Sequence, residues 1–137
     1  MKAERAVVDS NVLISALLVS NSPPRQCLDQ LASTGATLLF SDDTFTEVSL
    51  RLAKPKFDRY RSQKQLADFL SGLIDISEWV YPNIQISACR DDDDNKFLAL
   101  AISGDADCII TGDADLLILN PFESIPILAP ADYLRGN

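Results

Sequence analysis

The hydrophobic residues of this chain fall into short continuous runs separated by segments of helical periodicity. RAVVD at 5–9, ATLLFS at 36–41 and DCIIT at 107–111 predict three buried strands, and SIPIL at 124–128 predicts a fourth. Uninterrupted apolar runs of this length are typical of parallel strands that are covered on both faces. VYPNIQIS, residues 80–87, also has extended character, although its proline disfavours a regular strand.

Helices are predicted between these strands. Ser22 followed by two prolines marks a helix start, Gly35 ends that helix, and Pro55 stops the next one because the residue before proline leaves the helical region. The predicted helices are 11–19, 22–33, the segment from 42 to before Pro55, 62–76, 93–103 and a short one after Pro130. Alternating strands and helices predict an α/β fold with a parallel sheet between helices, in one domain spanning 1–137.

Composition adds that this is an ordinary folded protein, with 47% hydrophobic and 23% charged residues. The three cysteines, Cys27, Cys89 and Cys108, are odd in number, widely spaced and set in apolar stretches, which disfavours a disulfide framework or a zinc site. No apolar stretch approaches the roughly 20 residues that span a bilayer. These features predict a reduced, cytoplasmic protein without a membrane segment.

Acidic residues recur where a strand is followed by a helix or within the early turns of a helix, and the chain contains no histidine. Asp9 ends the first strand, Glu47 follows the second, Asp94 precedes the third, and Asp113 and Asp115 follow the third. Ligands of open parallel sheets bind beyond the carboxyl ends of the strands, where these residues can meet. Gathered carboxylates repel one another unless a hard divalent cation binds them, so we expect a Mg2+ or Mn2+ site.

Each of these acids also has an ordinary interpretation. Asp9 fits a helix cap, Glu47 a solvated helix position, and Asp113 with Asp115 a turn. The neighbours 91–93 are expected to cap a helix or to lie in a solvated loop. The functional interpretation rests on the joint occurrence of the acids at strand ends.

The protein is acidic overall, with a net charge of -8, but its positive charges are concentrated in one stretch of the chain. Six of the twelve Lys and Arg residues fall between 51 and 64. Together with Lys96 they could form a basic rim beside the carboxylates and bind a phosphodiester backbone; the alternative is an exposed helix end and loop whose charges only solvate it. The residues assigned to backbone contact are Arg51, Lys54, Lys56, Arg59 and Lys96.

Four segments in this order, VVDSNVLISAL, the helix with Glu47, RDDDDNKFLALA and CIITGDADLL, resemble the acidic motifs of the PIN domain family. The resemblance runs from Ala6 to about Leu128 and is to the branch described as toxin components of toxin–antitoxin systems. It implies a three-layer α/β/α sandwich and a metal-dependent ribonuclease. It also implies RNA as substrate, a cognate antitoxin and a homodimer as partners.

Carried over by position, the resemblance makes Asp9, Glu47, Asp94 and Asp113 the catalytic, metal-binding quartet, with Asp115 as a fifth ligand. Asn11 and Thr111 match site-supporting positions. Two positions depart from the family pattern: Asp92 replaces a proline, and Ala99 stands where an acidic residue is common. Mg2+ or Mn2+ held by these carboxylates would activate water for in-line attack on phosphorus, which predicts 5′-phosphate and 3′-hydroxyl products.

Other classes fit less well. A phosphatase of the haloacid dehalogenase type needs a second aspartate where this chain has Asn11, and a response-regulator receiver needs a lysine later than Lys96. The remaining alternative is a catalytically inert module that binds RNA or protein and uses the same fold.

Overall fold

The computed structural model describes residues 3–136 and contains a five-stranded parallel sheet of order β3-β2-β1-β4-β5. The strands are β1 (Arg5–Val8), β2 (Thr37–Phe40), β3 (Ser77–Trp79), β4 (Cys108–Ile110) and β5 (Ile127–Leu128). The helices are α1 (Ser10–Leu18), α2 (Pro23–Ser33), α3 (Asp42–Leu52), α4 (Gln63–Asp75), α5 (Asn95–Ser103), α6 (Ala114–Leu117) and α7 (Pro130–Leu134), with 3-10 turns η1 (Pro55–Phe57) and η2 (Asp92–Asp94).

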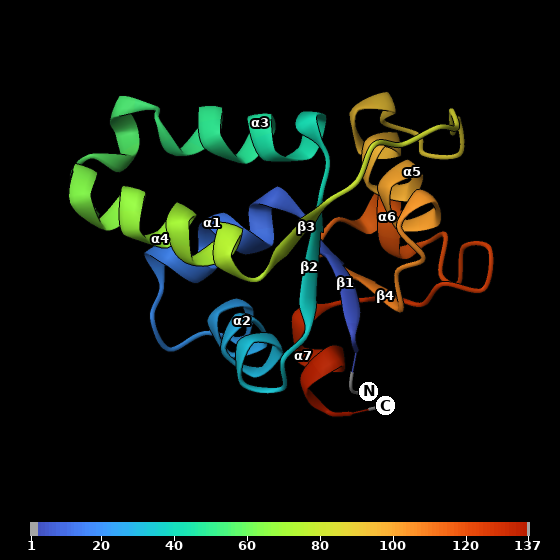
Figure 1. Ribbon diagram of the computed structural model, residues 1–137, viewed down its shortest axis with the longest axis horizontal. Coiled ribbons are helices and arrows are strands. Elements are labelled where there is room, and N and C mark those ends of the chain that lie inside the picture. The colour runs from blue at the N-terminus through green and yellow to red at the C-terminus, as the bar shows by residue number, and fades with distance from the viewer. Residues whose placement is uncertain (1–2, 137) are drawn as a thin grey trace.

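Helices cover both faces of the sheet. Helices α1, α2, α3, α4 and α7 pack on one face, and α5 and α6 pack on the other (Figure 1). Successive side chains of a strand point to opposite faces, so Val8 joins the first core and Val7 the second. Both cores are apolar, which explains the uninterrupted hydrophobic strands. The predicted three-layer α/β/α sandwich with a central parallel sheet is confirmed.

The predicted helix boundaries follow from local capping. The hydroxyl of Ser22 accepts from the N–H of Arg25 at the start of α2, with prolines in the first turn. Gly35 has φ of 75°, in the left-handed region, and this lets the N–H of Ala36 bond back to the carbonyl of Leu31 at 2.9 Å. Helix α3 ends at Leu52, before Pro55, as predicted.

Two short elements of the structure are not predicted from the sequence. Strand β3 lies at Ser77–Trp79, immediately before the segment 80–87 that is predicted to be extended. Its pairing with β2 ends where the N–H of Val80 donates to the carbonyl of Phe40 at 2.8 Å. Pro82 has no N–H to continue the ladder. The short helix α6 is not predicted by the sequence pattern, and Asp113 caps it by accepting from the N–H of Asp115.

The order of the strands reverses at β1, so the switch point of the sheet lies between β1 and β4. From β1 the chain winds outward to β2 and β3, then returns to β4 on the other side of β1. The N–H of Asp9 donates to the carbonyl of Ile110 at 3.0 Å, so the ends of these two strands are joined. Crevices at such switch points are where α/β sheets bind ligands.

None of the helices in residues 3–136 has both the length and the apolar character that a membrane span requires.

Candidate active site

Asp9 lies at the end of β1 and is 3% exposed. Its Oδ2 accepts a 2.6 Å hydrogen bond from the Thr111 hydroxyl, and its Oδ1 accepts from the backbone N–H of Asn11 at 3.2 Å. Burial is the largest influence and raises the pKa of Asp9, the hydrogen bonds oppose that effect, and the charges of Asp113 and Glu47 add to it. The carboxylate is therefore held in one orientation in a site that already contains other negative charges.

The fully buried hydroxyl of Thr111 joins two parts of the site. It donates to Asp9 and accepts from the backbone N–H of Asp113 at 3.0 Å. Asp113 in turn accepts from the N–H of Asp115 at 2.8 Å through Oδ1. This chain of bonds sets the turn after β4 relative to the end of β1, at the switch point of the sheet.

Three carboxylates converge beside this turn. Asp94, Asp113 and Asp115 each offer an oxygen, and these oxygens all lie within 4.8 Å of one another. Oδ2 of Asp94 is buried and has no hydrogen-bond partner among residues 3–136. Burial, and then the neighbouring Asp113 carboxylate, raise the pKa of Asp94 to about 7.

An oxygen-only donor set with a buried, unpaired carboxylate oxygen fits a hard divalent cation such as Mg2+ or Mn2+. A cation would neutralise the mutual repulsion of these acids and satisfy the free oxygen of Asp94. Asp94, Asp113 and Asp115 are the residues that could hold it. The structure brings together three of the five predicted metal ligands within this distance, with Asp9 connected to them through Thr111.

Asn95 follows Asp94 in the chain and is absent from the residues that the sequence pattern singles out. Its buried side-chain oxygen accepts from the N–H of Cys89 at 2.8 Å and of Ala88 at 3.2 Å, while its amide nitrogen donates to Asp92 at 3.3 Å. These bonds hold the loop before α5. The sequence feature that could have identified Asn95 is that it is a polar residue at the start of a helix whose other positions are mostly apolar and buried.

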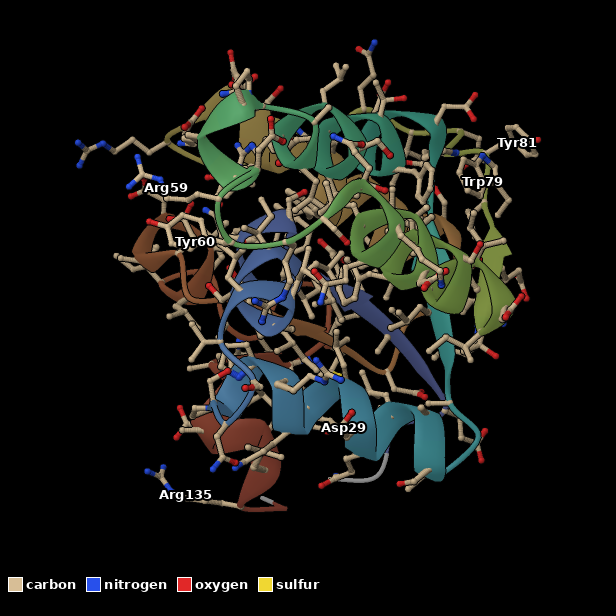
Figure 2. All side chains as sticks on the ribbon, turned by 90° about the vertical axis from the view of Figure 1, so that its left-hand side faces the viewer. Asp29, Arg59, Tyr60, Trp79, Tyr81 and Arg135 are labelled. Carbon is tan, nitrogen blue, oxygen red and sulfur yellow. The ribbon has the colours of Figure 1, made fainter. Side chains whose placement is uncertain are left out.

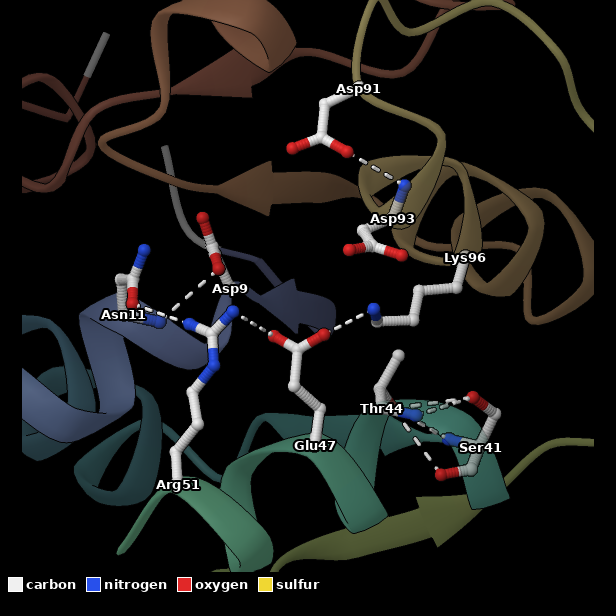
Figure 3. A network of polar contacts seen from close by, with 9 residues as sticks. All are labelled: Asp9, Asn11, Ser41, Thr44, Glu47, Arg51, Asp91, Asp93 and Lys96. Atoms are coloured by element: carbon white, nitrogen blue, oxygen red, sulfur yellow. Dashed lines mark hydrogen bonds and ion pairs between the residues drawn. The ribbon is translucent and has the colours of Figure 1, made fainter. Parts of the chain in front are cut away.

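Glu47 faces two cationic side chains rather than the three-carboxylate cluster. It forms ion pairs with Lys96 and, at 3.3 Å, with Arg51, and its side chain is 16% exposed. Arg51 also donates from Nη1 to Oδ1 of Asn11 at 2.7 Å, so the network extends from α3 to α1 (Figure 3). The 3-10 turn before α5 is capped separately by Asp91, whose carboxylate accepts from the N–H of Asp93.

The predicted basic residues have three kinds of surroundings, and Arg51 shares two of them because it also pairs with Glu47. Arg51, Lys54 and Lys56 line a hollow of about 280 Å³ that also includes Asn11. Lys96 lies against Glu47. Arg59 extends from the surface with its guanidinium 5.7 Å from the centre of the Tyr60 ring (Figure 2).

Comparison with known proteins identifies the family. Residues 5–115 match the PIN domain. The chain belongs to the PIN domain family. Proteins of this family are generally nucleases that use divalent metals, in agreement with the acidic cluster at the switch point.

Two further proteins are similar to this PIN domain. An uncharacterized protein of Methanocaldococcus jannaschii is 34% identical over 116 residues, which cover 84% of this chain and 74% of that protein. The crystal structure of VapBC2 from Rickettsia felis, bound to a DNA fragment from their promoter, matches with a TM-score of 0.60 and 12% identity, covering 91% of this chain and 98% of the matched one. At that identity the second match establishes the shared fold alone.

Proposed function

We propose that this PIN domain is an endoribonuclease that requires Mg2+ or Mn2+. The observation that carries the proposal is the cluster of Asp94, Asp113 and Asp115, each of which offers an oxygen within 4.8 Å of the other two. Oδ2 of Asp94 is in addition buried without a hydrogen-bond partner among residues 3–136. Burying like charges costs free energy, which a bound cation offsets. The cluster lies at the switch point, where this class of sheet binds its ligands.

Each acidic residue has a distinct role in this proposal. Asp94, Asp113 and Asp115 hold the cation, and Asp9 is positioned by Thr111 to complete the acidic side of the site. Glu47 completes the predicted quartet from α3 and is positioned by its ion pairs. The bound cation would act as a Lewis acid and lower the pKa of water in a phosphodiester hydrolysis.

Lys96 and Arg51 supply positive charge beside the carboxylates. A polyanionic strand approaching a protein of net charge -8 needs such a local attraction, because the overall field repels it. The hollow lined by Arg51, Lys54 and Lys56 extends that attraction along the surface. RNA is the substrate that we propose, bound through these residues and cut at the acidic cluster.

We also propose that the protein is the toxin of a toxin–antitoxin pair in the cytoplasm, with an antitoxin that covers the acidic site, and that it forms a homodimer. The fold shared with the VapBC2 structure supports the partner assignment. Coexpression with the protein encoded beside it and size-exclusion chromatography of the complex would test this assignment. A monomer that binds no neighbouring gene product would contradict it.

The decisive experiment for the activity is cleavage of an end-labelled RNA of mixed sequence in Mn2+ and in EDTA. Asp9→Asn and Asp113→Asn are expected to abolish metal-dependent cutting. Asp29→Asn is the matched control, because this exposed carboxylate on α2 pairs only with Arg25 among residues 3–136. Folded wild-type protein that binds Mn2+ but cuts nothing would favour the inert binding module.

A further inference from the structure

A mainly apolar cleft of about 480 Å³ opens beside the acidic cluster, between α1, the start of α2 and the start of α7. We name it the proline cleft. Its walls are Val12, Ser15, Pro23, Pro24, Ala129 and Pro130. Its volume lies within the range of small-molecule sites, and the pyrrolidine rings of three prolines form part of its apolar lining.

The proline cleft shares lining residues with two sites that suit phosphate. Its lining includes Asp113, which belongs to the proposed metal site. Its lining also includes Asn11, which lines the basic hollow of Arg51, Lys54 and Lys56. The basic hollow and the cation-binding cluster are therefore both contiguous with the apolar cleft.

The lining also offers a directional hydrogen bond. Oδ1 of Asn11 accepts from Arg51 at 2.7 Å, and Nδ2 of Asn11 points away from that guanidinium (Figure 3). Within residues 3–136 no acceptor is bonded to this Nδ2. Arg51 thus orients the side-chain amide of a residue that lines the cleft.

We propose that the proline cleft binds one unpaired nucleobase of the RNA, adjacent to the phosphate that is cut. The inference rests on the proposed function. The base would lie against the apolar walls, the phosphate on one side would lie at the acidic cluster, and the phosphate on the other side would lie over the basic hollow. Single-stranded RNA is recognised by enclosing splayed bases in this manner, and a base within a duplex could not enter.

Binding of mononucleotides tests this subsite without requiring cleavage. The four ribonucleoside 5′-monophosphates, and ribose 5-phosphate as a probe without a base, are titrated into 15N-labelled protein with Ca2+ present. We expect backbone amide shifts at Ser15, Gly112 and Ala131, with affinities that differ among the four bases and exceed that of ribose 5-phosphate. Ala131 is exposed at the opening of the cleft, so Ala131→Trp should fill it and weaken nucleotide binding about tenfold or more.

Ala67→Trp is the matched control, because Ala67 is an exposed alanine on α4 that does not line this cleft. Ser15→Leu, on the α1 wall, provides a second variant if Ala131→Trp does not fold. Equal affinities of the nucleotides and ribose 5-phosphate, or unchanged affinity in the folded variants, would overturn the proposal. Failure of every nucleotide to bind would also overturn it and would favour a protein segment as occupant.

Cleavage of a randomised RNA gives the second readout. Wild-type protein is expected to prefer certain bases at one position beside the cut, and Ala131→Trp is expected to change the preference at that position alone. A wild-type protein that cuts no RNA would refute the proposed nuclease, while the mononucleotide titration would still decide whether the cleft binds bases. A preference that is identical in wild type and Ala131→Trp would overturn the subsite and leave the nuclease intact.

Discussion

The hydroxyl of Thr111 donates a 2.6 Å hydrogen bond to the carboxylate of Asp9, although 102 positions separate the two residues in the chain. Both side chains are buried. The same hydroxyl accepts from the backbone N–H of Asp113, so one side chain orients the acid that follows β1 and the turn after β4. The relative placement of the acids therefore depends on a residue that carries no charge.

Thr111→Val is expected to destabilise the protein by about 1–3 kcal/mol, because it leaves a buried carboxylate without its strongest partner. It should also weaken Mn2+ binding, since the turn that carries Asp113 loses its anchor. Urea denaturation and calorimetric titration with Mn2+ measure the two effects. Thr111→Ser retains the hydroxyl and should preserve metal affinity; equal losses in both variants would assign the effect to packing.

The metal-free protein is expected to lose stability as pH rises. The pKa of Asp94 rises from an ordinary value of 3.8 to about 7 in the folded protein, so folding favours the protonated form. This contribution is fully present below about pH 4 and is lost as pH rises through about 7. Thermal unfolding between these limits, with EDTA, should show a decline that is shallower in Asp94→Asn.

Saturating Mn2+ should reverse this dependence, because the cation binds the ionised carboxylates and stabilises the folded state by mass action. The affinity for Mn2+ should increase as pH rises through about 7, because Asp94 loses its proton there, and should level off at higher pH. Identical pH profiles for wild type and Asp94→Asn would show that another group controls the dependence.

Charge reversal in the basic hollow is expected to weaken RNA binding at low salt. Lys54→Glu with Lys56→Glu should make the slope of log affinity against log salt shallower by about 0.7 for each phosphate of a single strand that the protein no longer neutralises. Fluorescence anisotropy with a labelled RNA at several salt concentrations measures the slope. Arg135→Glu is the control, since Arg135 follows α7 and pairs with Asp132.

Arg59→Glu tests a predicted RNA-binding residue in different surroundings, because Arg59 lies over the Tyr60 ring. Its effect on RNA affinity should be smaller than that of the double substitution in the hollow. If Arg59→Glu weakens RNA binding as much as the double substitution or more, the RNA binds along the surface near Tyr60. Unchanged binding in every reversal would refute the role assigned to this basic stretch.

Two glycines should respond in opposite directions to alanine. A Cβ on Gly104 would lie 2.7 Å from Cδ1 of Leu39 and 3.2 Å from the carbonyl oxygen of Leu100, so Gly104→Ala is expected to cost about 1–3 kcal/mol. Gly72 is within α4 and a Cβ there meets nothing within 4 Å, so Gly72→Ala should stabilise by about 0.5–1 kcal/mol. Chemical denaturation of both variants decides the signs.

The sandwich and most of its element boundaries could be predicted from the sequence, because they depend on local rules. Apolar runs produced β1, β2 and β4, and the caps at Ser22 and Gly35 bounded α2. The strand at 77–79 could not be predicted in this way, because its three residues, Ser, Glu and Trp, carry no apolar run, and only pairing with β2 makes them a strand.

The sequence by itself determined which residues are acidic and that they follow or precede the central strands. Only the tertiary structure decided that Asp94, Asp113 and Asp115 converge, while Glu47 pairs with Lys96. Strand order sets the first result, because β4 returns beside β1 after two other strands have formed. The Glu47–Arg51 pair follows from i,i+4 spacing within α3, whereas the pair with Lys96 exists only because α5 packs near α3. The proline cleft likewise exists only where α1, α2 and α7 meet, and the spacing of residues along the chain carries no information about contacts between separate elements.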